Sequence, residues 1–355
     1  MNANEQPSIL WHDYETWGIS PKFDKPSQFA GIRTDLDLNI IGEPEMFYCQ
    51  PPIDYLPHPE ACLVTGITPQ KAQREGLSEA EFANRIHNLF STPNTCVAGY
   101  NSIRFDDEVS RYLFYRNFFD PYAREWQNGN SRWDIIDMVR ACYALRPEGI
   151  NWPTVERDSK EVVSFRLELL TKANGISHES AHDAMSDVYA TIAMAKLIKD
   201  KQPKLYDFIF KLKGKKQVTE LLNVAEMTPV VHTSSKISSE YGCTSWFAPI
   251  SYHPVNKNAV ICVDLSRDIE PLLSLTSDEI KTRLYTRHDD LATDEKPIPV
   301  KLIHINKCPF VAPAKTLLPE NAQRLNIPRD YCLENLTTLK QHAELRDKLI
   351  DVFAP

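Results

Sequence analysis

An apolar, strand-like segment near the start of the chain, ILWHDYETWG at residues 9–18, contains two acids where a buried strand would have none. Side chains two residues apart in an extended chain point to the same side of a sheet, so Asp13 and Glu15 would be neighbours. Two carboxylates about 4 Å apart repel each other by roughly 4 kcal/mol at an effective dielectric constant near 20. The segment therefore predicts a strand with two acids on one face and a cation that binds between them.

The length and composition of the chain indicate a globular protein with two domains. Its 355 residues are 42% hydrophobic and 25% charged, which is ordinary for such proteins. The start, MNANEQPS, lacks the features of a signal peptide, and no apolar run reaches the ~20 residues of a membrane-spanning helix. The eight cysteines show no C-x-x-C spacing, which favours reduced thiols over a zinc or redox site. We therefore expect a cytoplasmic protein with no membrane partner.

The net charge of −8 is unevenly distributed along the chain. Residues 1–200 hold 19 Lys and Arg against 29 Asp and Glu, a balance of −10, whereas residues 201–355 hold 21 against 19, a balance of +2. This split suits an acidic first domain with a cation site and a second domain with basic patches. An uneven solvated surface explains it nearly as well.

Strand-like and helix-like segments alternate up to about residue 200, which predicts an α/β first domain. Strands are expected at 8–16, 28–34, 39–49 and 95–101, and helices at 69–74, 78–91, 105–118, 133–145, 166–174 and 183–200. After KLKGKK at 211–216 the sequence changes to short β-rich segments. The polar, turn-prone stretch KDKQPK favours a domain boundary near residue 202.

Two later segments add acids and a histidine. In YNSIRFDDE, Asp106 and Asp107 fall in the first turn of a predicted helix, where acids also complement the helix dipole. In AHDAMSD, His182 and Asp187 are five residues apart, which on a helix is about 140° beyond a full turn. His182 is therefore expected on the loop before the helix, with Asp187 on the second turn. A histidine there is often structural, so the pattern alone leaves its role open.

These segments together resemble the motifs of a known enzyme superfamily. Asp-x-Glu-Thr on the first strand, Asn-x-x-x-Phe-Asp after a later strand, and a histidine five residues before a final aspartate resemble the 3′→5′ exonucleases with a D-E-D-D-h site. That superfamily has an RNase H-like fold. Four longer blocks closely resemble the bacterial exonuclease I family, which degrades single-stranded DNA; they are HDYETWG, FDDEVSRYLFYRNF, NSRWDIIDMVRACYALRPEGINW and HDAMSDVYATIAMAKL. The likeness covers essentially the whole chain.

The resemblance implies a two-metal active site. The metal-binding acids would be Asp13, Glu15, Asp106 and Asp187. Two Mg²⁺ ions are implied as cofactors, with Mn²⁺ as a substitute, and oxygen ligands suit both. His182 matches the family's general base, since an imidazole with a pKa near ~6.5 accepts a proton from water at neutral pH. Asp106 is preferred to its neighbours Asp107 and Glu108 because it follows Phe105, as in the family's motif.

Contacts to the substrate are expected from arginines and aromatic residues. Arg166 matches a substrate-binding arginine of the family, and an ion pair with Glu168 or Glu179 is the alternative. Between residues 111 and 140 arginines and aromatics interleave, as a groove for unpaired strands requires, although half of them should belong to the core. The expected substrate-binding set is Glu15, Arg166, Arg111, Tyr122, Trp126 and Arg140. The lysines at 211–216 form either a solvated helix end or a further phosphate contact.

The sequence thus predicts an α/β, RNase H-like exonuclease domain at 1–202 and a small β-rich, Src-homology-3-like domain at 203–355 that flanks the DNA path. We expect a Mg²⁺-dependent enzyme that removes 5′-mononucleotides from the 3′ end of single-stranded DNA. The resemblance also implies a monomer, a place in DNA repair, and single-stranded DNA-binding protein as a partner.

Two other functions stay open at this point. An exoribonuclease would use the same acids, and a module that only binds single strands would use the same groove. Four clustered acids facing a polyanion argue against the second alternative. The family also has a C-terminal helical domain that closes over the strand. Because the sequence stops at IDVFAP, where that domain would begin, we expect distributive cleavage.

Overall fold

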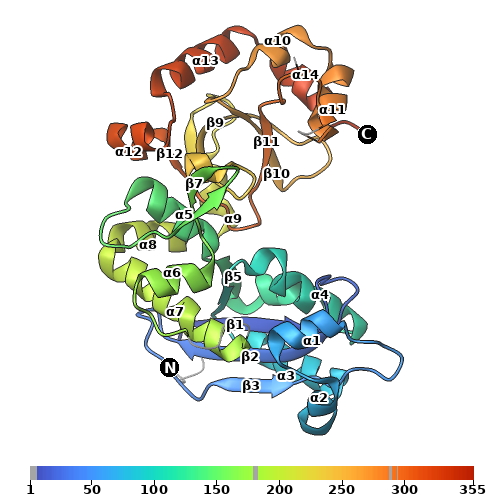
Figure 1. Cartoon of the computed structure of the whole chain (residues 1–355). Helices are drawn as coiled ribbons and strands as arrows, with labels where there is room; N and C mark the ends of the chain where they lie inside the picture. The colour runs from blue at the N-terminus through green and yellow to red at the C-terminus, as the bar shows by residue number, and fades with distance from the viewer. Residues whose placement is uncertain (1–5, 179–182, 288–289, 294) are drawn as a thin grey trace. The chain divides into compact units, whose positions relative to one another are not determined.

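The computed structural model describes residues 6–178, 183–287, 290–293 and 295–355, which divide into two compact units (Figure 1). The first unit comprises Met1–Ile136, Glu148–Pro153 and Ser164–Tyr206. The second comprises Asp137–Pro147, Thr154–Val163 and Asp207–Pro355. The chain therefore passes between the units several times, whereas the sequence suggested one boundary near residue 202.

The first unit is built on a mixed β-sheet with the strand order β3-β2-β1-β4-β5. The strands are β1 (Ser8–Thr16), β2 (Pro26–Thr34), β3 (Glu45–Tyr48), β4 (Thr95–Gly99) and β5 (Ser131–Asp134). The central strand β1 pairs antiparallel with β2 and parallel with β4. A central strand is covered on both faces. The residues of β1 are therefore buried, except Asp13 and Glu15, which are partly exposed.

The two faces of β1 have different partners. The helices of this unit are α1 (Pro59–Thr65), α2 (Pro69–Glu75), α3 (Glu79–Ser91), α4 (Asp106–Arg116), α6 (Leu167–Ala173) and α7 (Ala184–Lys201). Leu10 and Tyr14 belong to a buried aromatic cluster with side chains of α3 and α4. Asp13 and Glu15 alternate with these residues, and α7 packs against β1 and β2.

Local sequence signals explain where several helices begin. Ser78 and Glu81 form a capping box at the start of α3, because each side chain accepts a hydrogen bond from the other's backbone N–H. Asp183 accepts a hydrogen bond from the backbone N–H of Ser186 and so caps α7. Helix α4 has no side-chain cap but carries acids at 106–108 in its first turn, where the helix dipole favours negative charge.

The second unit contains an antiparallel sheet with the order β11-β10-β9-β8-β12. Its strands are β8 (Val230–Thr233), β9 (Thr244–Tyr252), β10 (Ala259–Asp264), β11 (Val300–His304) and β12 (Val311–Pro313), with the separate hairpin β6 (Thr154–Arg157) and β7 (Lys160–Val163). The accompanying helices are α5 (Ile136–Leu145), α8 (Pro203–Lys211), α9 (Lys215–Leu221), α10 (Glu270–Ser274), α11 (Ser277–Tyr285), α12 (Pro319–Arg324), α13 (Arg329–Gln341) and α14 (Glu344–Val352). Strands β9 and β10 are almost entirely buried and form the centre of this β-rich unit.

Most predicted elements are present, with two shifted boundaries. Of the strand expected at 39–49, only Glu45–Tyr48 forms a β-strand. The helix expected from 133 begins at Ile136, because residues 131–134 pair with β4 as strand β5. The eight cysteines carry free thiols, as expected. Within the described ranges, no helix is both long and apolar enough to cross a bilayer.

Candidate active site

Three acids from distant parts of the chain meet at the end of β1. The carboxylate oxygens offered by Asp13, Glu15 and Asp187 all lie within 4.8 Å of one another. The first two come from one face of β1. Asp187 comes from the first turn of α7 and not from the second turn, as predicted, because the helix begins at Ala184; α7 packs on that strand. The structure thus brings together three of the acids that the sequence predicted as metal ligands.

The fourth predicted acid, Asp106, is held beside the same strand. It is buried at the start of α4, and its Oδ1 accepts a hydrogen bond from the backbone N–H of Tyr14 at 3.1 Å. The Tyr14 hydroxyl lies 3.0 Å from Oγ of Ser110, one turn further along α4. Because Tyr14 stands between Asp13 and Glu15, these two contacts fix Asp106 next to both. We call Asp13, Glu15, Asp106 and Asp187 the acid cluster.

Three acids of the cluster, Asp13, Glu15 and Asp106, are surrounded by other carboxylates. Burial raises the pKa of Glu15 to about 9 and that of Asp106 to about 8, and the neighbouring carboxylates contribute to both shifts. Burial and the charges of Asp106 and Glu15 also raise the pKa of Asp13 well above its usual range. Among the described residues, no lysine or arginine forms an ion pair with these three acids. Such a site is suited to a divalent cation with oxygen ligands.

A histidine that the sequence analysis did not single out contacts the cluster. Nε2 of His178 lies 2.5 Å from Oδ1 of Asp187, and Nδ1 lies 3.1 Å from the hydroxyl oxygen of Thr171 on α6. Because a carboxylate oxygen accepts, Nε2–H of His178 is the donor to Asp187. Hydrogen bonds of this kind orient metal ligands. His178 precedes α7 and follows the turn at Gly175, so no helical periodicity could have linked it to Asp187.

The expected general base, His182, lies outside the described residues. The structure does describe how the next residues are anchored. Gln28 on β2 donates to the Asp183 carboxylate and accepts from the Ala184 backbone N–H, both at 3.3 Å. Gln28 is buried and pairs in register with Glu15 across the two strands. The start of α7 is therefore tied to the strand pair that carries Glu15.

Three of the predicted substrate-binding residues are accessible. Tyr122 and Trp126 are 55% and 65% exposed, and they flank the short 3₁₀ turn Ala123–Glu125. Arg166 directly precedes α6, and its side chain is 69% exposed. Its Nε donates to Glu168 at 2.8 Å, which is the ion pair expected as the alternative. Exposed pairs of this kind are worth about 0–1 kcal/mol, so Arg166 can exchange its partner for a phosphate.

Arg111 and Arg140 have less freedom. Arg111 is largely buried, donates to Glu125 at 2.9 Å and pairs with Glu108. Arg140 lies in the second unit and pairs with Asp137 at 2.7 Å. These contacts favour structural roles, and their contact with a DNA strand stays a prediction. The sequence could not separate them from groove residues, because their acidic partners on other turns are not apparent from spacing.

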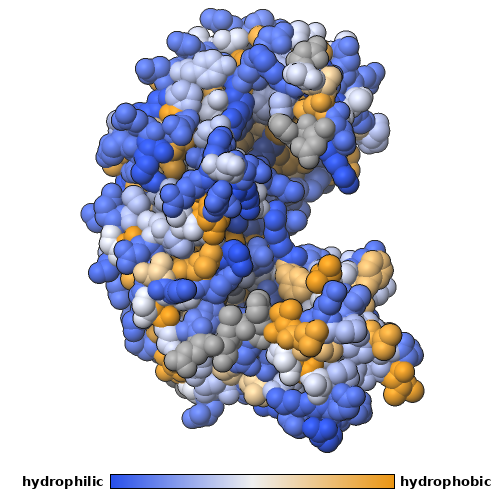
Figure 2. All heavy atoms as spheres, viewed as in Figure 1, coloured by the Kyte–Doolittle hydropathy of each residue, from blue (hydrophilic) through white to orange (hydrophobic). Residues whose placement is uncertain are grey.

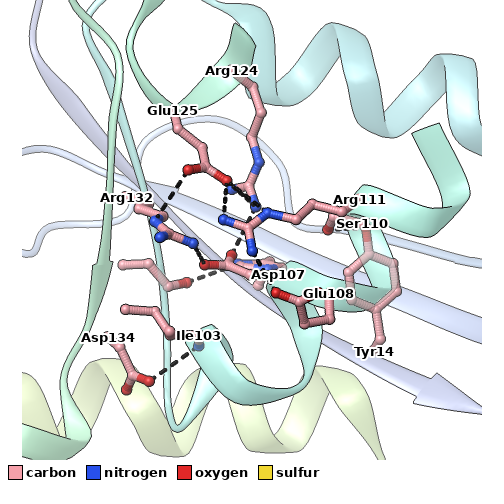
Figure 3. Close-up of polar contacts among 12 residues, drawn as sticks. Tyr14, Ile103, Asp107, Glu108, Ser110, Arg111, Arg124, Glu125, Arg132 and Asp134 are labelled. Carbon is pink, nitrogen blue, oxygen red and sulfur yellow. Dashed lines mark hydrogen bonds and ion pairs between the residues drawn. The ribbon is translucent and has the colours of Figure 1, made fainter. Parts of the chain in front are cut away.

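A set of alternating arginines and carboxylates lies around the first turns of α4 (Figure 3). We call it the arginine–carboxylate network; its members are Asp107, Glu108, Arg111, Arg124, Glu125 and Arg132. Asp107 accepts hydrogen bonds from Arg124 and Arg132, each at 2.8 Å. Burial opposes the ionisation of Asp107, but the charges of the two arginines outweigh it and lower the pKa of Asp107. From the sequence, Asp107 is a rival metal ligand or a complement to the helix dipole, and neither prediction includes its arginine partners.

A pocket of about 500 Å³ lies elsewhere on the first unit. It is lined mainly by prolines and apolar side chains, namely Pro51, Pro52, Ile53, Tyr55, Pro57 and Pro69, together with Gln70, Gln73 and Arg74. Figure 2 shows apolar side chains on the surface of this unit around α1, where Leu63 and Val64 are exposed. None of the predicted site residues lines the pocket, so it does not belong to the acid cluster.

Two family models match successive parts of the chain. Residues 10–195 match the family model described as "Exonuclease", and residues 213–355 match that of the "Exonuclease I SH3-like domain". The fold and the acid cluster therefore define the class of the protein. It is an exonuclease in which an α/β exonuclease domain is followed by a β-rich SH3-like domain. The fold class expected from the sequence is confirmed.

Relatives of high sequence identity show the family. The chain is 57% identical to Exodeoxyribonuclease I of Escherichia coli strain K12 over 99% of its own length and 74% of that protein. It is 57% identical to Exodeoxyribonuclease I of Haemophilus influenzae over 98% and 73%. The structure of E. coli Exonuclease I in complex with a dA16 oligonucleotide matches with a TM-score of 0.96 at 58% identity, covering 99% of this chain and 74% of that one. The chain belongs to the exodeoxyribonuclease I family, as its motifs predicted, and is a DNA exonuclease.

Proposed function

We propose that the protein removes 5′-mononucleotides from the 3′ end of single-stranded DNA, with two Mg²⁺ ions held by the acid cluster and with His182 as the general base. The observation that carries this proposal is the approach of Asp13, Glu15 and Asp187 within 4.8 Å, beside Asp106. Solved relatives support the substrate, since structures of E. coli Exonuclease I contain dA16 and dT13 oligonucleotides. One relative is described as a zinc ion bound form of the ExoI–ssDNA complex, which supports a divalent metal at this kind of site.

The donor atoms of the acid cluster fit Mg²⁺ or Mn²⁺. All four are carboxylates, which are hard oxygen ligands, and no cysteine belongs to the described cluster. Held by these four acids, such ions would supply an activated water molecule and stabilisation of the leaving 3′ oxygen of a phosphodiester. With pKa values of about 9 and 8, Glu15 and Asp106 hold protons at neutral pH that a divalent cation displaces.

The protein's own residues have separate tasks in this proposal. The acids are ligands, so His182 takes the proton from the attacking water. His178 keeps Asp187 oriented through the hydrogen bond to its Oδ1. Arg166 binds a phosphate, while Tyr122 and Trp126 stack on bases of the unpaired strand.

The test is a cleavage assay with 5′-labelled single-stranded DNA and RNA of one sequence, with Mg²⁺, with Mn²⁺ or with EDTA. We expect DNA to shorten stepwise from its 3′ end only when Mg²⁺ or Mn²⁺ is present. A strand blocked by a 3′ phosphate serves as the control for polarity. RNA shortened as fast as DNA would favour the exoribonuclease, and strand binding without shortening in Mg²⁺ would favour the binding module.

We further propose that the enzyme is a monomer with single-stranded DNA-binding protein as its partner. The support is the family to which the chain belongs. Light scattering of the purified chain measures its mass in solution. Co-sedimentation with single-stranded DNA-binding protein, in the absence of DNA, tests the partner.

A further inference from the structure

The arginine–carboxylate network connects two parts of the first unit that the proposed function uses separately. One end of the network is Asp107, the residue next to Asp106 of the acid cluster. The other end is the turn that carries Glu125, between the exposed rings of Tyr122 and Trp126. Both ends belong to the same compact unit.

At the acid-cluster end, Asp107 fixes the first turn of α4. Its two carboxylate oxygens accept separate hydrogen bonds from Arg124 and Arg132, and the three side chains are only 2%, 1% and 5% exposed. Arg132 lies on β5, so Asp107 joins the start of α4 to the sheet. The preceding loop is held in the same way, since Asp134 at the end of β5 accepts from the backbone N–H of Ile103 (Figure 3). The turn that presents Asp106 is therefore held from two sides.

At the other end, exposed rings and buried charges alternate along one short segment. Tyr122 and Trp126 are exposed, whereas Arg124 is 2% exposed and Glu125 is largely covered. Glu125 accepts from Arg111 at 2.9 Å and lies 3.3 Å from Nε of Arg132. The guanidinium of Arg111 also lies 5.0 Å from the centre of the Tyr122 ring. The charges of this segment thus hold its backbone while its rings remain free.

We propose that the arginine–carboxylate network is a positioning device that sets the acid cluster and the Tyr122–Trp126 segment at a fixed separation. A strand stacked on the two rings then presents its terminal phosphodiester to the acids. The network contains three arginines and three carboxylates, so its charges balance internally. Buried ion pairs add little net stability compared with apolar packing, but they require a defined geometry. This inference rests on the proposed function, and it assigns positioning roles to Asp107 and Glu125.

The experiment compares two substrates in the full chain. The p-nitrophenyl ester of thymidine 5′-monophosphate reaches the acid cluster but is too short to stack on both rings, whereas a 20-nucleotide single strand uses both parts. Glu125→Gln removes one of the two charged acceptors of both Arg111 and Arg132, which keep Glu108 and Asp107, and loosens the aromatic segment. We expect kcat/KM to fall about tenfold more for the oligonucleotide than for the ester, the factor expected for one lost charged hydrogen bond.

A second variant tests the other end of the network. Asp107→Asn should lower kcat/KM for both substrates and raise the Mg²⁺ concentration needed for half-maximal rate, because it loosens the turn that carries Asp106. Glu79→Gln is the matched control, since Glu79 pairs with Arg116 at the opposite end of α4 at 3.1 Å and has no contact with the network. It should leave the ratio of the two kcat/KM values unchanged.

The outcomes separate positioning from mere stability. Melting temperatures and circular dichroism spectra of all variants are recorded at the assay conditions, and Glu125→Gln carries the test alone if Asp107→Asn does not fold. An equal loss on both substrates in Glu125→Gln would overturn the inference. So would the same change of ratio in Glu79→Gln. Absence of Mg²⁺-dependent cleavage of either substrate by the wild-type chain would contradict the proposed function instead.

Discussion

Asp106 and Asp107 are consecutive residues in the first turn of α4, yet they have opposite electrostatic environments. Both are buried and both are near the same helix N-terminus. Burial raises the pKa of Asp106 to about 8, whereas two arginines lower the pKa of Asp107. Since both residues share the burial and the helix dipole, the difference between their pKa values comes from the arginine counter-ions of Asp107. The protein supplies cations to Asp107 and leaves Asp106 to a cation from solution.

The same contrast separates the acid cluster from the arginine–carboxylate network. The network balances its charges internally and is complete as folded. The acid cluster gathers four carboxylates, and three of them have no basic partner among the described residues. We infer that the network contributes to folding at neutral pH, while the cluster opposes folding until a divalent cation binds.

The largest expected effect comes from removing an acid of the cluster. Asp13→Ala and Asp187→Ala should abolish cleavage, because each removes a ligand. In EDTA, the melting temperature of each variant should equal or exceed that of the wild type, because fewer carboxylates repel one another. The control is Asp54→Ala, which removes an exposed acid of the same unit. Substantial Mg²⁺-dependent activity in either cluster variant would refute the ligand assignment.

The next effect distinguishes the two histidines before α7. His182→Ala should bind Mg²⁺ and DNA but lose roughly 10²–10⁴-fold in rate, the usual contribution of general acid–base catalysis. The wild-type rate should fall below about pH 6.5 as an imidazole protonates. His178→Ala should instead raise the Mg²⁺ requirement, because His178 orients Asp187. A His182→Ala enzyme with wild-type turnover would show that water is activated without this base.

A third prediction tests the contrast between the neighbouring aspartates through protein stability. Asp107→Asn should destabilise the metal-free protein by about 3–5 kcal/mol, because it removes the buried carboxylate that both Arg124 and Arg132 bind and leaves them only Glu125 as an ionised partner. Asp106→Asn should stabilise it at neutral pH, because it removes a carboxylate that resists ionisation. Urea unfolding in EDTA at pH 7 measures both free energies of unfolding. Changes of the same sign would contradict the comparison.

The pH dependence of that stability has opposite signs for the two residues. The folded-state pKa of Asp106 lies above its unfolded value, so its contribution to stability is greatest below about pH 4 and is lost as the pH rises to about 8. The folded-state pKa of Asp107 is lowered, so its contribution is present above about pH 4 and is lost on acidification. Repeating the urea series at pH 2, 4, 6 and 8 separates the two, because Asp106 acts between about pH 4 and 8 and Asp107 below about pH 4.

The sequence predicted the acid cluster better than the network for a physical reason. The spacing of Asp13 and Glu15 is a local property of a strand, and the capping residues of α3 are likewise local. The role of Asp107 depends instead on Arg124 and Arg132, which are 17 and 25 residues further along the chain. Such contacts arise when the fold brings β5 and the turn Ala123–Glu125 to the start of α4, and they leave no periodic signal.

The roles of the interleaved arginines were likewise only partly predictable from the sequence. A run of arginines and aromatics is typical of a strand-binding groove, but the run alone does not reveal which arginines have acidic partners. Arg111 is engaged by Glu108 and Glu125, whereas Arg166 has only an exposed pair with Glu168. Nor could the composition near residue 202 show that Asp137–Pro147 packs with the second unit, because that grouping depends on tertiary contacts.

A fourth prediction concerns the rings next to the network. Tyr122→Ala and Trp126→Ala should each weaken single-strand binding by about 1–3 kcal/mol if bases stack there, with little effect on the salt dependence. Fluorescence anisotropy with a labelled strand in Ca²⁺ or EDTA measures binding without cleavage. Phe118→Ala is the control, because Phe118 is a 99% exposed ring on the same segment of chain. Equal weakening in all three variants would argue against a specific stacking site.

The smallest expected effect distinguishes an exposed arginine from the arginines of the network. Arg166→Ala should reduce the slope of log affinity against log salt by about one phosphate contact, because its side chain is 69% exposed and its pair with Glu168 is weak. Lys172→Ala removes another exposed cation from the same helix and should leave the slope nearly unchanged if the contact is specific. Since Arg166 holds no partner in the network, the melting temperature should not change. Equal slopes in wild type and Arg166→Ala would mean that the guanidinium stays with Glu168 when the strand is bound, and the strand's phosphates would then be bound by other cations.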